Sequence, residues 1–256
     1  METSAAPRRP LRVLRRVVVV FVVVVALLAT AFGIYANTVS LANRDMSLLA
    51  WTNPAVDIEV TDHSIVMTPT GESSGTGLVF IPGAKVEPAA YLYKLSGLVE
   101  IAGATVVITK PTLNLAFFDT RPLSTFEADA PEVDSWLVGG HSLGGVRACQ
   151  LADDPDVRGL VLFGSYCAND LSSADLAVLS ISGSNDGLST PDKIADAQDN
   201  LPSDTTFVEI AGGNHAGFGD YGDQAGDGES TLPSADVRDQ IAEAFLAQYG
   251  VGRVIN

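Results

Sequence analysis

The sequence predicts an α/β protein with a mostly parallel central sheet flanked by helices, preceded by an N-terminal transmembrane helix. Two observations support this prediction. Short continuous apolar runs, which are typical of strands buried on both faces, alternate with stretches of helical character. Ahead of them, residues 17–36 are almost wholly apolar and are long enough to cross a bilayer core as a helix.

The N-terminal segment predicts export of everything that follows it. Residues 1–40 contain five arginines, all ahead of the apolar run, and a single acidic residue. Because such basic segments stay in the cytoplasm, the rest of the chain is expected outside it. The apolar run continues to residue 36, which favours an uncleaved single-pass anchor in the cell membrane after a basic cytoplasmic segment, 1–16. The alternative is a signal peptide cleaved at the small residues 29–31, followed by secretion.

The exported part divides into a linker, 37–55, a folded domain, 56–250, and a short tail, 251–256. The predicted strands are 58–60, 64–68, 77–81, 104–109, 135–139, 159–163, 176–182 and 206–210, of which the first two form a hairpin. The predicted helices are 88–103, 143–152, one that opens at 190–191, and one that begins near 234 and stops at Gly250. Strands that alternate with helices in this order form a mostly parallel sheet.

The composition favours a folded, acidic domain. Hydrophobic residues make up 46% of the 256 residues and charged residues 18%, so the chain can bury a core. The formal net charge is −16, and residues 41–256 carry −20, because they hold 30 of the 31 acidic residues and 10 of the 15 basic ones. A surface this acidic repels phosphate backbones, which argues against nucleic acid as a partner.

Metal binding and disulfide formation receive little support from the sequence. No spacing is typical of a zinc site, and Asp220, Asp223 and Asp227 do not match a calcium loop, so a solvated acidic loop is expected there. Cys149 and Cys167 can pair in an exported protein, but their separation in space cannot be read from the sequence. Their disulfide therefore stays an open alternative.

A G-x-S-x-G motif, Gly140-His141-Ser142-Leu143-Gly144, lies between a predicted strand and a predicted helix. A turn this tight crowds the backbone, so small residues are needed two positions before and two positions after the serine. The serine then projects from the top of the sheet at a helix N-terminus, which can stabilise a developing oxyanion. This context favours Ser142 as a nucleophile over a capping serine in an ordinary glycine-rich turn.

Two later loops supply an acid and a base. Asp186 directly follows strand 176–182, where it can accept a hydrogen bond from an imidazole N–H, although alone it could equally be a turn residue. His215 follows strand 206–210 and is the one histidine of three that a late loop can carry over the sheet. Nucleophile, acid and base therefore appear in the order Ser142, Asp186, His215, each just after a predicted strand.

With these motifs in place, residues 76–250 resemble an α/β-hydrolase of the small, lid-poor type related to the dienelactone hydrolase family. The likeness rests on the blocks FIPGAKVEPAAY, GGHSLGG, SGSNDG and GGNHAGFGDYG and covers about two-thirds of the chain. Dienelactone hydrolases use a cysteine nucleophile where this chain has Ser142. The resemblance therefore implies the α/β-hydrolase fold in a serine-nucleophile variant, and it does not extend to lactone specificity.

The resemblance also implies an oxyanion hole. Pro82-Gly83-Ala84 stands where related enzymes carry His-Gly-x, so the backbone N–H of Ala84 is expected to act with that of Leu143, the residue after the nucleophile. Lys85 is a further candidate for substrate contact at the mouth, and its alternative is a solvated loop lysine. No metal or organic cofactor is implied.

The connection 164–175 between two predicted strands is too short to hold a cap domain. The site is therefore expected to be open, with walls formed by the segment 110–131, which includes Phe117 and Phe118, and by the loop 212–230. An open, acidic site favours neutral or cationic esters as substrates.

The sequence thus predicts a membrane-tethered, extracytoplasmic serine hydrolase, similar to a carboxylesterase, that cleaves a small-molecule ester or a related acyl bond. Ser142 would attack, His215 would act as general base and then as general acid, and Asp186 would orient His215. Two alternatives remain: an acyltransferase that uses the same triad, and a catalytically silent binding module on the cell surface.

Overall fold

The structure is a computed structural model, and it describes residues 9–250. The predicted tail, 251–256, and the first eight residues of the predicted basic segment lie outside this range. The chain divides into two units, Met1–Thr38 and Val39–Asn256. The first contains helix α1 (Arg9–Asn37), in which Val13–Asn37 is long and apolar enough to span a membrane, a property that signal sequences share.

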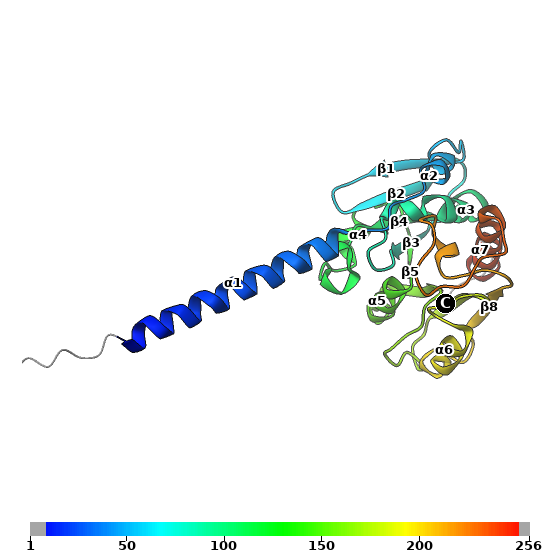
Figure 1. Ribbon diagram of the computed structural model, residues 1–256. Helices are drawn as coiled ribbons and strands as arrows, with labels where there is room; N and C mark the ends of the chain where they lie inside the picture. Colours follow the sequence, from blue (N-terminus) through cyan, green and yellow to red (C-terminus); the bar gives the residue numbers. More distant parts are fainter. Residues whose placement is uncertain (1–8, 251–256) are drawn as a thin grey trace, which may run out of the picture. The chain divides into compact units, whose positions relative to one another are not determined.

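The second unit is built on an eight-stranded sheet with the order β1-β2-β4-β3-β5-β6-β7-β8 (Figure 1). The strands are β1 (Val56–Val60), β2 (Ser64–Pro69), β3 (Thr76–Ile81), β4 (Thr105–Thr109), β5 (Ser135–His141), β6 (Val157–Phe163), β7 (Ala177–Gly183) and β8 (Thr206–Ile210). The helices are α2 (Arg44–Trp51), α3 (Leu92–Ala102), α4 (Ser124–Glu127), α5 (Leu143–Leu151), α6 (Pro191–Asp196) and α7 (Ser234–Tyr249). Short 3₁₀ turns are η1 (Pro88–Tyr91), η2 (Thr112–Asn114), η3 (Ala116–Phe118), η4 (Gln198–Asn200) and η5 (Ala216–Phe218).

Six neighbouring strands, from β4 to β8 across the sheet, are parallel, whereas β1 and β2 form an antiparallel hairpin whose second strand pairs with β4. This arrangement confirms the predicted α/β class with a mostly parallel sheet. Since all six parallel strands run the same way, their carboxyl ends lie along one edge of the sheet. Polar side chains in the loops that follow these strands are thereby brought together.

Both faces of the sheet are buried, which explains why its strands are continuous apolar runs. In β3, Leu78 and Phe80 join the core cluster that α3 and α7 cover, while Val79 and Ile81 join the cluster that includes α5 residues such as Ala148. Helices α3 and α7 lie side by side in Figure 1, on the face opposite α5. The core therefore has two layers, and the sheet is held rigidly between them.

The segment predicted as a linker contains helix α2. Its N-terminus is capped by Asn43, whose side chain accepts hydrogen bonds from two backbone N–H groups of the first turn, and Ala50 is fully buried. The three largest apolar side chains of its last turn, those of Leu48, Leu49 and Trp51, are exposed. The sequence therefore lacks the inward-facing apolar stripe by which a helix is recognised.

The structure joins Cys149 of α5 to Cys167, which follows β6, in a disulfide with a Cα–Cα distance of 5.5 Å. Both cysteines are buried in the α5 layer of the core. The bridge ties the helix that begins after Ser142 to the segment that leaves the neighbouring strand. This contact answers the question that the sequence leaves open.

Replacing both cysteines with alanine should lower the free energy of unfolding. The bridge closes a loop with a sequence separation of 18, and the loss of chain constraint for a loop of that length is worth about 3 kcal/mol. Denaturant unfolding of the full chain, with and without the double substitution, measures the difference. Reduction of the wild-type protein should have a similar effect, and an unchanged unfolding midpoint in both cases would contradict the prediction.

Candidate active site

Ser142 occupies a tight turn between β5 and α5. Its φ of 52° and ψ of −124° place a residue other than glycine at positive φ, a backbone conformation that is unfavourable and is often found at functional sites. The N–H of Ser142 donates to the carbonyl of Phe163 over 3.1 Å, and the Ser165 hydroxyl donates to the Ser142 carbonyl over 2.7 Å. The end of β6 therefore holds the backbone of this turn in place.

Two glycines of the motif are required by close packing. A Cβ on Gly140 would lie 2.5 Å from the carbonyl carbon of Gly144, and a Cβ on Gly144 would lie 2.1 Å from the carbonyl oxygen of Ile81. Both distances are shorter than any van der Waals contact, so neither position accepts a side chain. The motif thus brings the end of β3 against the first turn of α5.

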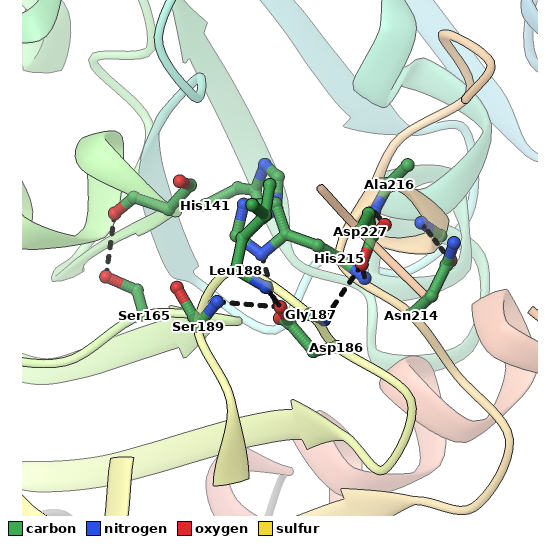
Figure 2. Close-up of polar contacts among 12 residues, drawn as sticks. His141, Ser165, Asp186, Gly187, Leu188, Ser189, Asn214, His215, Ala216 and Asp227 are labelled. Carbon is green, nitrogen blue, oxygen red and sulfur yellow. Dashed lines mark hydrogen bonds and ion pairs between the residues drawn. The ribbon is translucent and has the colours of Figure 1, made fainter. Parts of the chain in front are cut away.

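Asp186 and His215 form a buried pair in which the Nδ1 of His215 lies 2.8 Å from Oδ2 of Asp186 (Figure 2). The other carboxylate oxygen accepts the backbone N–H groups of Leu188 at 2.8 Å and Ser189 at 2.7 Å. Because an ionised carboxylate is an acceptor only, Nδ1 of His215 carries the proton. The Nε2 atom of His215 is buried and makes no hydrogen bond among the described residues, so its lone pair is left to act as a base.

The three sequence-predicted residues follow β5, β7 and β8, and β6 lies between β5 and β7 in the sheet. The rings of His141 and His215 have centroids 4.4 Å apart, which brings His215 against the residue that precedes Ser142. Gly164, at the end of β6, is close enough that a Cβ there would lie 2.9 Å from the Asp186 carboxylate. The loops after β5, β7 and β8 therefore meet around the end of β6.

The segment after β3 is held so that Ala84 is presented between two fixed neighbours. The N–H of Gly83 donates to the hydroxyl of Tyr91 over 2.9 Å, and the N–H of Lys85 donates to the carbonyl of Asn114 over 2.8 Å. Ala84 itself is exposed. Leu143 is the first residue of α5, where a backbone N–H has no intrahelical acceptor.

Tyr91 is a site residue that sequence reasoning missed. Its hydroxyl lies 2.9 Å from Nδ1 of His141 while it accepts the N–H of Gly83, so it joins the segment after β3 to the strand that carries Ser142. Burial raises the pKa of the Tyr91 hydroxyl, and burial together with the nearby His215 lowers the pKa of His141 well below its usual value. Tyr91 therefore stays protonated and donates to a neutral His141. A tyrosine within a predicted helix carries no sequence signal of this role.

Asp227 is a second residue whose role sequence reasoning missed. Its carboxylate accepts the N–H groups of His215 at 3.1 Å and Ala216 at 2.8 Å, and also that of Gly187 at 3.1 Å (Figure 2). It therefore ties the loop of His215 to the loop of Asp186. The expectation of a solvated acidic loop is wrong here, because this carboxylate is occupied by backbone donors.

Asp220, from the same loop, is also bonded rather than solvated. It is buried and forms an ion pair with the buried Lys94 of α3 at 2.9 Å. Burial lowers the pKa of Lys94, and the adjacent Asp220 carboxylate opposes that shift. A cleft of about 580 Å³ lies beside this pair and is lined partly by the loop of His215, and Ser142 is not among its lining residues. The Lys94–Asp220 ion pair fixes the loop that follows His215 against α3.

The remaining predicted site residues lie on the segment after β3 and on η3. Lys85 is half-buried and has a φ of 59°. Phe117 and Phe118 are about half exposed on η3, which packs against α5. Within residues 9–250, no group of three or more His, Cys, Asp or Glu residues could hold a metal ion.

Comparison with known proteins identifies the class that this fold and site define. A model of the alpha/beta hydrolase family matches residues 77–239, which is more than half of the chain, so the protein belongs to that family. The structure is similar to the crystal structure of the esterase domain of a Rhodothermus marinus protein, with a TM-score of 0.56 and 14% sequence identity over 75% of this chain and 96% of that one. At this identity the likeness concerns the fold alone. A search of curated protein sequences found no match.

Replacing Tyr91 with phenylalanine should slow hydrolysis without weakening substrate binding. The N–H of Gly83 would lose its acceptor, and the segment that presents Ala84 would loosen. We therefore expect kcat on p-nitrophenyl acetate to fall about tenfold, with KM unchanged within about twofold. This loss in kcat is smaller than the factor of about 10²–10³ that follows removal of a whole oxyanion donor. Tyr93→Phe, two residues further on in α3, is the matched control and should leave kcat unchanged. A rise in KM with constant kcat would contradict a positioning role.

Replacing Asp227 with asparagine should destabilise the loops that carry Asp186 and His215. The amide has one acceptor atom in place of two and brings an NH₂ group toward backbone donors, so we expect a loss of about 1–3 kcal/mol in the free energy of unfolding. Asp223→Asn, at an exposed position of the same loop, is the control. Equal unfolding midpoints for the two variants would contradict the role assigned to Asp227.

Proposed function

We propose that this protein is a serine hydrolase of esters or related acyl bonds, anchored in the cell membrane by residues 17–36, with its catalytic domain, 56–250, outside the cytoplasm. The observation that carries the proposal is the buried His215–Asp186 pair, at 2.8 Å, whose imidazole packs against His141, the residue before a serine held at positive φ on a strand-to-helix turn. Membership of the alpha/beta hydrolase family supports hydrolase chemistry.

In the first half of the reaction, Nε2 of His215 removes the proton of the Ser142 hydroxyl as its oxygen attacks the carbonyl carbon of the ester. The carbonyl oxygen becomes an oxyanion, which the N–H groups of Ala84 and Leu143 stabilise. Asp186 keeps the proton on Nδ1 and stabilises the imidazolium that forms. The imidazolium then protonates the leaving alkoxide, the C–O bond breaks, and an acyl-enzyme remains on Ser142.

In the second half, a water molecule replaces the alcohol. Nε2 of His215 takes a proton from the water as its oxygen attacks the acyl carbon, and the same two N–H groups stabilise the second oxyanion. Breakdown returns the proton to the Ser142 oxygen and releases the carboxylic acid. Phe117, Phe118 and Lys85, at the rim, are proposed to contact the substrate.

Three observations support an anchored enzyme outside the cytoplasm. The helix Val13–Asn37 is long and apolar enough to span a bilayer, and five arginines precede the apolar run. The disulfide between Cys149 and Cys167 is a feature of proteins from oxidising compartments. The arginines favour an orientation with the folded domain outside the cytoplasm, and the disulfide favours the same side of the membrane.

Substitution of the triad tests the proposal. Ser142→Ala and His215→Ala should each lower kcat on a soluble ester by at least about 10⁴-fold, and the double variant should lose no more than either single one, because the residues act as a unit. Asp186→Asn should also lower kcat strongly, since the amide favours the wrong imidazole tautomer.

The matched control is Ser172→Ala, at an exposed serine far along the chain from the turn, which should retain full activity. Labelling by a fluorophosphonate probe should disappear in Ser142→Ala alone among the serine variants. Retention of esterase activity by a folded Ser142→Ala protein would contradict the assignment of Ser142 as the nucleophile.

A further inference from the structure

Helix α2 displays its large apolar side chains to solvent. Leu48 is 54% exposed, Leu49 51% and Trp51 47%, and Leu41, just before the helix, is 68% exposed, whereas the small Ala50 is buried. A helix on the surface of a soluble domain normally turns its largest apolar residues inward. Such a group of exposed apolar residues indicates an interaction surface. We refer to these four side chains as the α2 face.

The length of the chain keeps Leu41, the first residue of the α2 face, close to any membrane that α1 enters. The candidate span ends at Asn37, and Leu41 is four residues further on. Since an extended chain covers at most about 3.6 Å per residue, Leu41 lies within about 14 Å of the end of the span. Tryptophan and leucine on a short amphipathic helix are the side chains that bury themselves in the interfacial layer of a bilayer.

The segment that connects α1 to α2 is bonded to the loops of the active site. The N–H of Ser40 donates to the carbonyl of Lys85 over 2.7 Å, and the Ser40 carbonyl accepts the N–H of Glu87 at 3.0 Å. Three residues later, the N–H of Asn43 donates to the carbonyl of Asp220, in the loop after His215, over 2.6 Å. Residues 40–43 therefore lie against the segment after β3 and against the loop that follows His215.

The rim of the site next to this segment is apolar. The carbonyl of Lys85 accepts the hydrogen bond from Ser40, and the N–H of Lys85 donates to the carbonyl of Asn114. Asn114 belongs to a segment in which Leu113, Phe117 and Phe118 are exposed. An entrance bordered by half-exposed phenylalanines suits a substrate with an acyl chain.

We propose that the α2 face lies in the interfacial layer of the membrane that holds α1, and that the substrate of Ser142 is an ester of a lipid-like amphiphile presented by that membrane. The statement about the substrate rests on the hydrolase function proposed above. The statement about the membrane contact does not, so the two parts are tested separately.

Trp51 reports on the membrane contact directly, because Trp136 of β5 is the second of only two tryptophans. The full chain, with Trp136→Phe, is reconstituted into phosphatidylcholine vesicles, with or without bromine at the upper part of the acyl chains. Trp51 fluorescence should fall by at least half in the brominated vesicles. If Trp136→Phe does not fold, the difference between wild type and Trp51→Phe gives the same signal.

Equal Trp51 fluorescence in both kinds of vesicle, from protein that remains in the vesicles, would overturn the membrane contact. Crosslinked pairs of chains without quenching would overturn it as well, since the α2 face would then bind a second copy.

Activity measured on two substrates tests the substrate class. The variant Leu48→Ser/Leu49→Ser/Trp51→Ser should hydrolyse a fluorogenic diacyl ester embedded in the same vesicles about tenfold more slowly than wild type, while p-nitrophenyl acetate in solution is hydrolysed at an equal rate. Phe207→Ser, at an exposed phenylalanine of β8, is the control and should change neither rate.

The outcomes of this experiment are distinct from one another. Equal rates of variant and wild type on the embedded ester would overturn the assignment of a membrane-presented substrate. Wild type that hydrolyses neither ester would instead refute the hydrolase function itself, and the Trp51 measurement would still decide the membrane contact.

Discussion

The structure depends on one close approach, that of the Ser142 turn to the ends of the two strands beside β5. The absence of a Cβ at Gly140 and Gly144 lets the first turn of α5 rest on the carbonyl of Ile81, and bonds from the end of β6 fix the backbone of Ser142. A parallel sheet covered on both faces makes these strand ends rigid. The unfavourable φ of Ser142 is tolerated because its surroundings determine the backbone from both sides.

Around this turn, carboxylates hold the loops of the candidate site together. Asp186 fixes the imidazole of His215, Asp227 gathers the backbone of the two loops, and Asp220 pairs with Lys94. Each of these interactions joins segments that are distant in sequence, and charge-assisted bonds to backbone N–H groups are among the stronger hydrogen bonds. Part of the acidity of the domain is therefore structural.

A residue's role can be predicted from the sequence when it depends on its neighbours along the chain, and it cannot when it depends on a partner that only the fold brings close. The parallel strands and Ser142 are predictable because buried strands are continuous apolar runs and the tight turn demands glycines around the serine. Asp227 and Tyr91 are not, because their partners are backbone N–H groups that the fold brings close. Helix α2 escapes prediction for another reason, since its apolar side chains point outward.

The bonds of Ser40 and Asn43 also bear on whether the folded unit depends on the residues that directly follow α1. A chain that began after residue 43 would leave the carbonyl of Lys85, the N–H of Glu87 and the carbonyl of Asp220 without these partners. Two of these groups belong to the segment that presents Ala84, and the third belongs to the loop that follows His215. Residues 40–43, which follow α1, are therefore part of the support of the candidate site, and their removal would leave the loops that carry Ala84 and His215 without these bonds.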